Sequence, residues 1–215
     1  VLGDPYDLHR SAAFVRGALM PQSRASMLVA RALDPRPGER VLDLCAAPGG
    51  KTTHLAALMG DDGEVVAVEA DPRRAHDLRA NAARLGARSV RVVVGDAAQP
   101  DHGSGYDRVL VDPPCSDLGT LQSRPDARWR KTPEQVQELR SLQQRILDSG
   151  AQAVGPGGRL VYSTCTISAP ENEQQAQEFL ARHPGFVADA GGFVKTLPHR
   201  DRTDGFFIAA FERHG

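Results

Sequence analysis

The stretch Val41–Lys51, VLDLCAAPGGK, decides the fold of this chain. Val41–Leu44 is short and mostly apolar, which predicts a buried strand, and a helix is expected over 52–59. Between them, small residues and the paired glycines Gly49 and Gly50 let the backbone approach a ligand closely. The free N–H groups at the start of the helix would point at the same place. Without a ligand, these residues would form only a tight turn from strand to helix.

The same strand-to-helix alternation continues along the chain. Further strands are predicted at 64–68, 90–94, 108–111, 159–162 and 206–211, and further helices at 8–20, 22–33, 72–85, 133–153 and 170–182. This order predicts an α/β domain with a mostly parallel sheet and helices on both faces. We expect residues 1–38 to form an N-terminal helical segment and residues 39–215 to form the α/β domain. Gly155, Gly157 and Gly158 are expected to separate the long helix from the strand after it.

Composition narrows the class of protein. The 215 residues are 40% hydrophobic and 25% charged, as in soluble globular proteins. No apolar run reaches the roughly 18 to 20 residues that cross a bilayer, and no signal-peptide pattern opens the chain, so we expect a cytoplasmic protein with no membrane partner. Its three cysteines are far apart and lack zinc-ligand spacing, which predicts a reducing compartment and no metal. The net charge of −1 gives no direct support to nucleic-acid binding, although it does not exclude a local basic patch.

Carboxylates follow two of the predicted strands. Glu69 lies roughly 20 residues past the glycine turn, where an acidic residue typically binds ribose hydroxyls, and Asp96 follows the next strand. Asp71 is better suited to capping a helix. The G-x-G-x-x-G fingerprint of dinucleotide sites is missing. These residues favour a nucleoside-containing cofactor with few phosphates or none.

Two cysteines follow two other strands. Asp112-Pro113-Pro114-Cys115 comes after the strand at 108–111, and Cys165 follows the strand at 159–162. Neighbouring strands lie about 4.8 Å apart, so both thiols could reach one substrate base. A lone cysteine after a strand is usually a small buried residue. Two at matching strand ends, one of them beside a carboxylate, favour a catalytic site.

Three segments together resemble a known family. They are Leu42–His54 (LDLCAAPGGKTTH), Asp112–Cys115 and Thr164-Cys165, supported by 124–129, 170–172 and 204–207. Over about residues 14–213 the chain resembles the Sun/Fmu and Nop2/NSUN family of RNA (cytosine-5)-methyltransferases. The resemblance implies a Rossmann-like class I methyltransferase fold with a mostly parallel seven-stranded sheet. It also implies S-adenosyl-L-methionine as cofactor and RNA as substrate, with ribosomal RNA favoured over transfer RNA.

The resemblance also implies roles for individual residues. Cofactor contacts carry over to Cys45, Ala46, Ala47, Pro48, Gly49, Gly50, Lys51, Glu69, Asp96 and Asp112. Cys165 would add to carbon 6 of cytosine, which activates carbon 5 for methylation, and Cys115 would allow release of the product. Asp112 could hydrogen-bond ring N3. Lys51 would position the base or favour the thiolate, unless it is only a solvated lysine at a helix start.

Departures from the family pattern leave alternatives open. Glu69 stands where many relatives have Asp, and Pro113 replaces a common Ala. The resulting Asp-Pro-Pro-Cys resembles the motif of amino-group methyltransferases acting on nucleic acid or protein. Few residues precede the cofactor motif, so an N-terminal RNA-binding domain or a partner protein could be missing. A non-catalytic RNA-assembly factor that retains the fold is a further alternative.

One basic segment is a candidate RNA contact. It contains Arg124, Arg128, Trp129, Arg130 and Lys131. Its cations could bind phosphates while Trp129 stacks on a base. The competing interpretation is a solvated loop with Trp129 packed beneath it.

Overall fold

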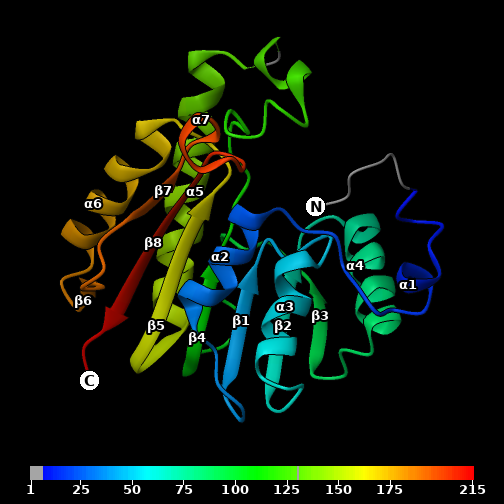
Figure 1. The fold of residues 1–215 in the computed structure, drawn as a ribbon. Coiled ribbons are helices and arrows are strands. Elements are labelled where there is room, and N and C mark those ends of the chain that lie inside the picture. The colour runs from blue at the N-terminus through cyan, green and yellow to red at the C-terminus, as the bar shows by residue number, and fades with distance from the viewer. Residues whose placement is uncertain (1–6, 130) are drawn as a thin grey trace.

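The structure is a computed structural model that describes residues 7–129 and 131–215 (Figure 1). Its strands are β1 (Arg40–Leu44), β2 (Glu64–Glu69), β3 (Val90–Val94), β4 (Tyr106–Val111), β5 (Val154–Thr164), β6 (Phe186–Ala188), β7 (Val194–Thr196) and β8 (Phe206–Arg213). They form one sheet in the order β3-β2-β1-β4-β5-β8-β6, with β7 also paired to β8. The strands from β3 to β5 are parallel, and β8 is antiparallel to its neighbours. The predicted mostly parallel sheet is therefore confirmed.

The sheet has eight strands where seven were expected. The strand β6 pairs with residues 211–213 of β8, and β7 pairs with residues 206–208 of the same strand. Both are antiparallel to β8, so they lie end to end along its outer edge. The seventh position of the sheet is thus filled by one strand interrupted between residues 188 and 194.

Helices cover both faces of the sheet (Figure 1). They are α1 (Ala12–Val15), α2 (Arg24–Leu33), α3 (Gly50–Leu58), α4 (Pro72–Leu85), α5 (Pro133–Ala153), α6 (Glu173–Arg182) and α7 (Pro198–Asp201), with 3₁₀ turns η1 (Pro125–Trp129) and η2 (Ala169–Glu171). One face packs against α2, α3 and α4, and the other against α5 and α6. Alternate side chains of β1 lie on opposite faces of the sheet: Val41 packs in one apolar core, and Leu42 and Leu44 pack in the other.

Capping explains the helix boundaries that the sequence predicted well. Asp71 caps α4, since its carboxylate accepts a hydrogen bond from the N–H of Arg73 at 2.7 Å, and Gly86 ends that helix in the left-handed conformation. Thr132 and Gln135 form a reciprocal capping box at the start of α5. The helices predicted at 72–85 and 133–153 are therefore confirmed.

Other predicted boundaries were wrong. The helix expected at 8–20 is only the four-residue α1, because Gly17 has φ +75° and a Cβ there would lie 1.7 Å from the carbonyl oxygen of Arg84. The glycines expected to precede β5 lie inside it, since the strand begins at Val154. Gly155 lets that strand approach Gly105, and the register of β4 against β5 shifts between Tyr106 and Arg108.

The N-terminal segment is anchored to the domain at two places. Buried Ala25, Val29 and Leu33 pack α2 into the core beside α3. The guanidinium of Arg84 in α4 donates hydrogen bonds to the carbonyl oxygens of Phe14 and Leu19 and lies 3.8 Å from the centre of the Phe14 ring. These contacts hold the chain so that residues 20–26 lie opposite the glycine turn.

Within residues 7–129 and 131–215, no helix has the length and apolar character to span a bilayer.

Candidate active site

The glycine turn follows β1 at the carboxyl edge of the sheet. The N–H of Ala46 donates to the carbonyl of Val68 at 2.9 Å, which ties the turn to β2. Cys45 has φ +68°, and Gly49 has φ +101°, a conformation that favours glycine. A Cβ on Gly49 would also lie 2.5 Å from the side chain of Leu78. Helix α3 begins at Gly50, two residues earlier than expected, so its first N–H groups face this turn.

Asp43 lies beneath the turn and was missed as a site residue. Its side chain is almost completely buried, and the Thr52 hydroxyl donates to its Oδ2 at 2.6 Å. Its other oxygen, Oδ1, is buried and has no hydrogen-bond partner among the described residues. Burial raises the pKa of this carboxyl to about 7. The available sequence signal was a single acidic residue within the apolar run of β1.

Glu69 is the last residue of β2, one residue beyond the predicted end of that strand, and Asp96 follows β3; the two carboxylates differ in surroundings. Glu69 is buried; it accepts a 3.3 Å hydrogen bond from the N–H of Ala47 and pairs with Arg74 at 3.4 Å. It therefore braces the glycine turn. Asp96 is exposed, and its carboxylate accepts a hydrogen bond from the N–H of Ala98 at 3.0 Å.

Lys51 and Asp112 form the central ion pair of the site. The Lys51 ammonium donates to Asp112 Oδ2 at 2.6 Å, and the Ser163 hydroxyl donates to Oδ1 at 2.6 Å. Burial lowers the pKa of Lys51, but the adjacent Asp112 carboxylate outweighs this, so the net pKa is raised. Lys51 is partly buried in an ion pair, so the interpretation of a solvated helix-start lysine is wrong.

The two cysteines meet at the ends of the neighbouring strands β4 and β5. Their Sγ atoms are 3.3 Å apart, as the sequence predicted from matching strand ends. Asp117 completes the cluster: the Cys165 thiol donates to its Oδ1 at 3.0 Å, and Cys115 Sγ lies 3.6 Å from the same oxygen. Sequence reasoning missed Asp117. Its spacing of two residues from Cys115 was the only signal, and a loop residue with φ +60° is not evident from spacing.

The resting form of Cys165 follows from these neighbours. Its hydrogen bond with Cys115, its burial, and the negative charge of Asp117 all raise the pKa of the Cys165 thiol far above its ordinary value. These neighbours therefore favour the protonated thiol of Cys165 over the thiolate.

Buried polar contacts hold the two cysteine loops together. The fully buried Glu171 accepts hydrogen bonds from the N–H and hydroxyl of Ser116, at 2.9 and 2.6 Å. Asn172 accepts from the Thr164 hydroxyl at 2.5 Å and donates to the carbonyl of Thr166 at 2.9 Å. The segment 170–172, which supported the family resemblance, therefore positions the loops that bear both thiols.

Two cavities meet at this site and share Cys45, Ala47 and Asp112. The thiol cavity, of about 350 Å³, is lined by Cys45, Ala47, Arg74, Asp112, Pro113, Pro114, Cys115, Asp117, Arg124, Lys131, Leu139 and Cys165. The turn cavity, of about 250 Å³, lies between the glycine turn and residues 20–26, and Asp43 and Lys51 line it. Nearly all predicted catalytic and cofactor residues thus border two connected hollows. Gly49, Glu69 and Asp96 line neither of them.

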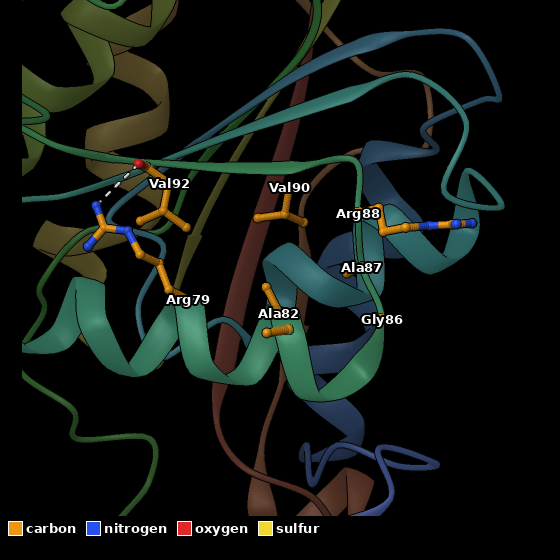
Figure 2. Close-up of a pocket in the computed structure, with 8 residues that line it drawn as sticks. Arg79, Ala82, Gly86, Ala87, Arg88, Val90 and Val92 are labelled. Carbon is orange, nitrogen blue, oxygen red and sulfur yellow. Dashed lines mark hydrogen bonds between the residues drawn. The ribbon is translucent and has the colours of Figure 1, made fainter.

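A separate hollow of about 370 Å³ lies between α4 and β3. Figure 2 shows Ala82, Ala87, Val90 and Val92 around it, with Arg79 donating to the carbonyl of Val92. The described residues that line it include no thiol and no carboxylate, the groups that the predicted chemistry uses.

The basic segment follows the loop that bears Cys115 and Asp117. In Figure 1 the segment between β4 and α5 rises above the carboxyl ends of the parallel strands. Arg124 and Lys131 line the thiol cavity. Trp129 is 83% exposed, with the Arg128 guanidinium 5.9 Å from its ring centre, so the interpretation of a packed Trp129 is wrong. Arg130 lies outside the described residues.

The chain was compared with known families, proteins and structures. Residues 30–212 match the model of the family described as 16S rRNA methyltransferase RsmB/F. The chain is 41% identical to the probable ribosomal RNA small subunit methyltransferase B of Synechocystis sp., over 93% of this chain and 49% of that protein. It is 37% identical to the Bacillus subtilis protein of the same name, over 94% of this chain and 49% of that protein. The chain therefore spans about half the length of these curated relatives.

Solved structures give the same result. The crystal structure of PH0851 superposes with a TM-score of 0.94 at 39% identity, covering 98% of this chain and 50% of that one. The structure of NSun6 from Pyrococcus horikoshii with SFG superposes with a TM-score of 0.90 at 33% identity, covering 98% of this chain and 57% of that one. These similarities confirm the Rossmann-like methyltransferase fold. The chain belongs to the RsmB/F family of methyltransferases, within the Sun and Nop2/NSUN group that its motifs resemble.

Proposed function

We propose that this chain transfers a methyl group from S-adenosyl-L-methionine to carbon 5 of a cytosine in RNA. One observation carries the proposal: two thiols 3.3 Å apart line one cavity together with Asp112, the partner of Lys51, and with residues of the glycine turn. A nucleophile and a second proton-handling thiol are what addition to carbon 6, followed by elimination, requires. The family match and the relatives' names support the same reaction.

The residues around the glycine turn fit the proposed cofactor. S-adenosyl-L-methionine has a sulfonium and an ammonium group but no phosphate, and it supplies the methyl group when bound. The turn cavity offers the carboxyls of Asp43 and Asp112, and no hydrogen bond from the described residues reaches Asp43 Oδ1. Those oxygens complement a cationic ligand, whereas a pyrophosphate would be repelled. Glu69 braces the turn through Ala47 and is proposed to contact ribose.

Different residues of the chain would form the bond to the base and transfer its protons. Cys165 would form the bond to carbon 6, and Asp112 and Lys51, held 2.6 Å apart, would present a proton to ring N3. Ser163 fixes the orientation of Asp112 through a 2.6 Å hydrogen bond. Once carbon 5 is methylated, Cys115 would take the carbon 5 proton, directly or through water, so that the Cys165 bond breaks.

The RNA partner is the less defined part of the proposal. Ribosomal RNA is favoured over transfer RNA because the curated relatives are named as ribosomal RNA methyltransferases. Arg124 and Lys131 in the thiol cavity would bind backbone phosphates, and exposed Trp129 would stack on a flanking base. Arg128 and Arg130 belong to the same proposed surface. A further RNA-binding domain or partner is proposed to assist, and the reaction is proposed to take place in the cytoplasm.

The test uses the wild-type chain, Cys165→Ala and Cys115→Ala with methyl-labelled cofactor and unmodified cellular RNA. We expect 5-methylcytidine from wild type, no product from Cys165→Ala, and a protein–RNA adduct that survives denaturing gels from Cys115→Ala. Cofactor binding, measured by calorimetry, should be retained in all three and controls for folding. Methyl transfer by Cys165→Ala would contradict the covalent mechanism and favour an amino-group methyltransferase. Cofactor and RNA binding without any transfer by wild type would favour the assembly factor.

A further inference from the structure

We propose that Asp117 is a further catalytic residue, which accepts the proton of Cys165 as this thiol attacks the base. The inference rests on the proposed function, since it concerns the first step of that reaction. Its basis is geometric: Asp117 Oδ1 lies 3.0 Å from Cys165 Sγ, at hydrogen-bond distance from the proton that must leave.

The loop holds this carboxylate in place. Asp117 has φ +60°, a left-handed conformation that Asp and Asn tolerate better than other non-glycine residues. Its carbonyl oxygen accepts hydrogen bonds from the N–H and the hydroxyl of Thr120, at 3.0 and 2.9 Å. Gly119 then donates its N–H to the carbonyl of Cys165 at 3.0 Å. The turn that contains Asp117 is thus hydrogen-bonded directly to the backbone of the nucleophile.

The first step requires a proton acceptor, because the Cys165 thiol, which donates a hydrogen bond to Asp117, must lose its proton when the sulfur bonds to carbon 6. The described residues lining the thiol cavity include no histidine, and their carboxylates are Asp112 and Asp117. Both oxygens of Asp112 already accept hydrogen bonds, from Lys51 and Ser163. Asp117 is therefore the carboxylate to which the proton of Cys165 points.

The step balances without a further reagent. The Cys165 sulfur forms a bond to carbon 6 while its S–H bond breaks, and the proton passes to the Asp117 carboxylate. The electrons of the carbon 5–carbon 6 double bond move into the ring, and N3 takes a proton from the Lys51–Asp112 pair. Asp117 later returns its proton to Cys165 when the sulfur–carbon bond breaks, which restores the starting thiol.

The test compares wild type with Asp117→Asn and Asp117→Gly. Both replacements tolerate a positive φ, so both keep the turn while removing the carboxylate. Asp62→Asn is the matched control, because Asp62 is exposed and precedes β2 at the opposite edge of the sheet. The measured quantity is the rate of covalent adduct formation on RNA containing 5-fluorocytidine, from pH 6 to pH 9, with saturating cofactor.

We expect adduct formation at neutral pH to fall by about 10²-fold in both Asp117 variants, the size typical of a lost general base. The rate of the variants should recover as pH rises, because solvent base replaces the carboxylate, whereas Asp62→Asn should follow wild type. Equal or faster adduct formation by both variants across the pH range would overturn the inference, since Asp117 would then only oppose the thiolate. Absence of an adduct from wild type would instead refute the proposed function.

Discussion

Gly119 offers a test of how accurately the two cysteine loops must fit together. It is buried, its N–H donates to the carbonyl of Cys165 at 3.0 Å, and its own carbonyl accepts from the N–H of Gly205 at 2.8 Å. In Gly119→Ala, the added Cβ would lie 1.9 Å from the Gly205 carbonyl oxygen and 2.8 Å from that of Cys165. Contacts between a Cβ and another atom shorter than 3.0 Å are essentially never seen, so the backbone of one loop must move by about 1 Å.

Both the rate and the stability should respond to this movement. A displacement of about 1 Å at a reacting group costs about 10²-fold in rate, and overpacking of this kind costs about 1–3 kcal/mol of folding free energy. The assays are adduct formation under single-turnover conditions and urea unfolding, with cofactor binding expected to stay near wild type because the glycine turn lies on another loop. Gly185→Ala is the control, since a Cβ there would meet nothing within 4 Å. A Gly119→Ala protein with wild-type rate and stability would refute the reasoning.

Three further predictions concern other parts of the structure. The pKa of Asp43 is about 7 in the folded state, above its ordinary value of 3.8. Between these pH values the folded state binds more protons than the unfolded state. The free energy of unfolding should therefore fall as pH rises from about 4 to 7. Asp43→Asn should remove that fall in urea midpoints measured from pH 4 to 8; an unchanged slope would contradict it. Arg84→Ala should lower the free energy of unfolding by about 1–3 kcal/mol, because the carbonyls of Phe14 and Leu19 lose their hydrogen-bond donor. Limited proteolysis should then cleave within residues 14–20. Protection of this segment equal to that in wild type would contradict its anchoring by Arg84. The sulfur atoms of Cys115 and Cys165 and a carboxylate oxygen of Asp117 lie within 4.8 Å of one another. Zinc should therefore inhibit adduct formation by the wild type reversibly, and inhibit Asp117→Asn less strongly. Equal inhibition constants would exclude Asp117 as a zinc ligand.

The fold was predictable where local chemistry decides the structure. Val41, Leu42 and Leu44 place apolar side chains on both faces of β1, as expected where helices cover both faces, and Asp71 and Gly86 mark the ends of α4 by capping alone. The end of α1 at Val15, just before Gly17, was not predictable, because Gly17 packs against the carbonyl of Arg84, far away in the sequence.

The residues of the site likewise fall into those that the sequence predicts and those that it does not. Lys51, Asp112, Cys115 and Cys165 were predictable because parallel strands bring the residues after them to one edge. Asp117 was not, because its role depends on a left-handed loop conformation and on a partner on another strand.

The separation of the two sulfur atoms also has a consequence for oxidation. At 3.3 Å, Cys115 and Cys165 need little rearrangement for a two-electron oxidant to join them in a disulfide, with release of both thiol protons. That bond would block both the proposed nucleophile and the proposed release residue, and a dithiol reductant would restore both thiols. The proposed methyl transfer would then require reducing conditions.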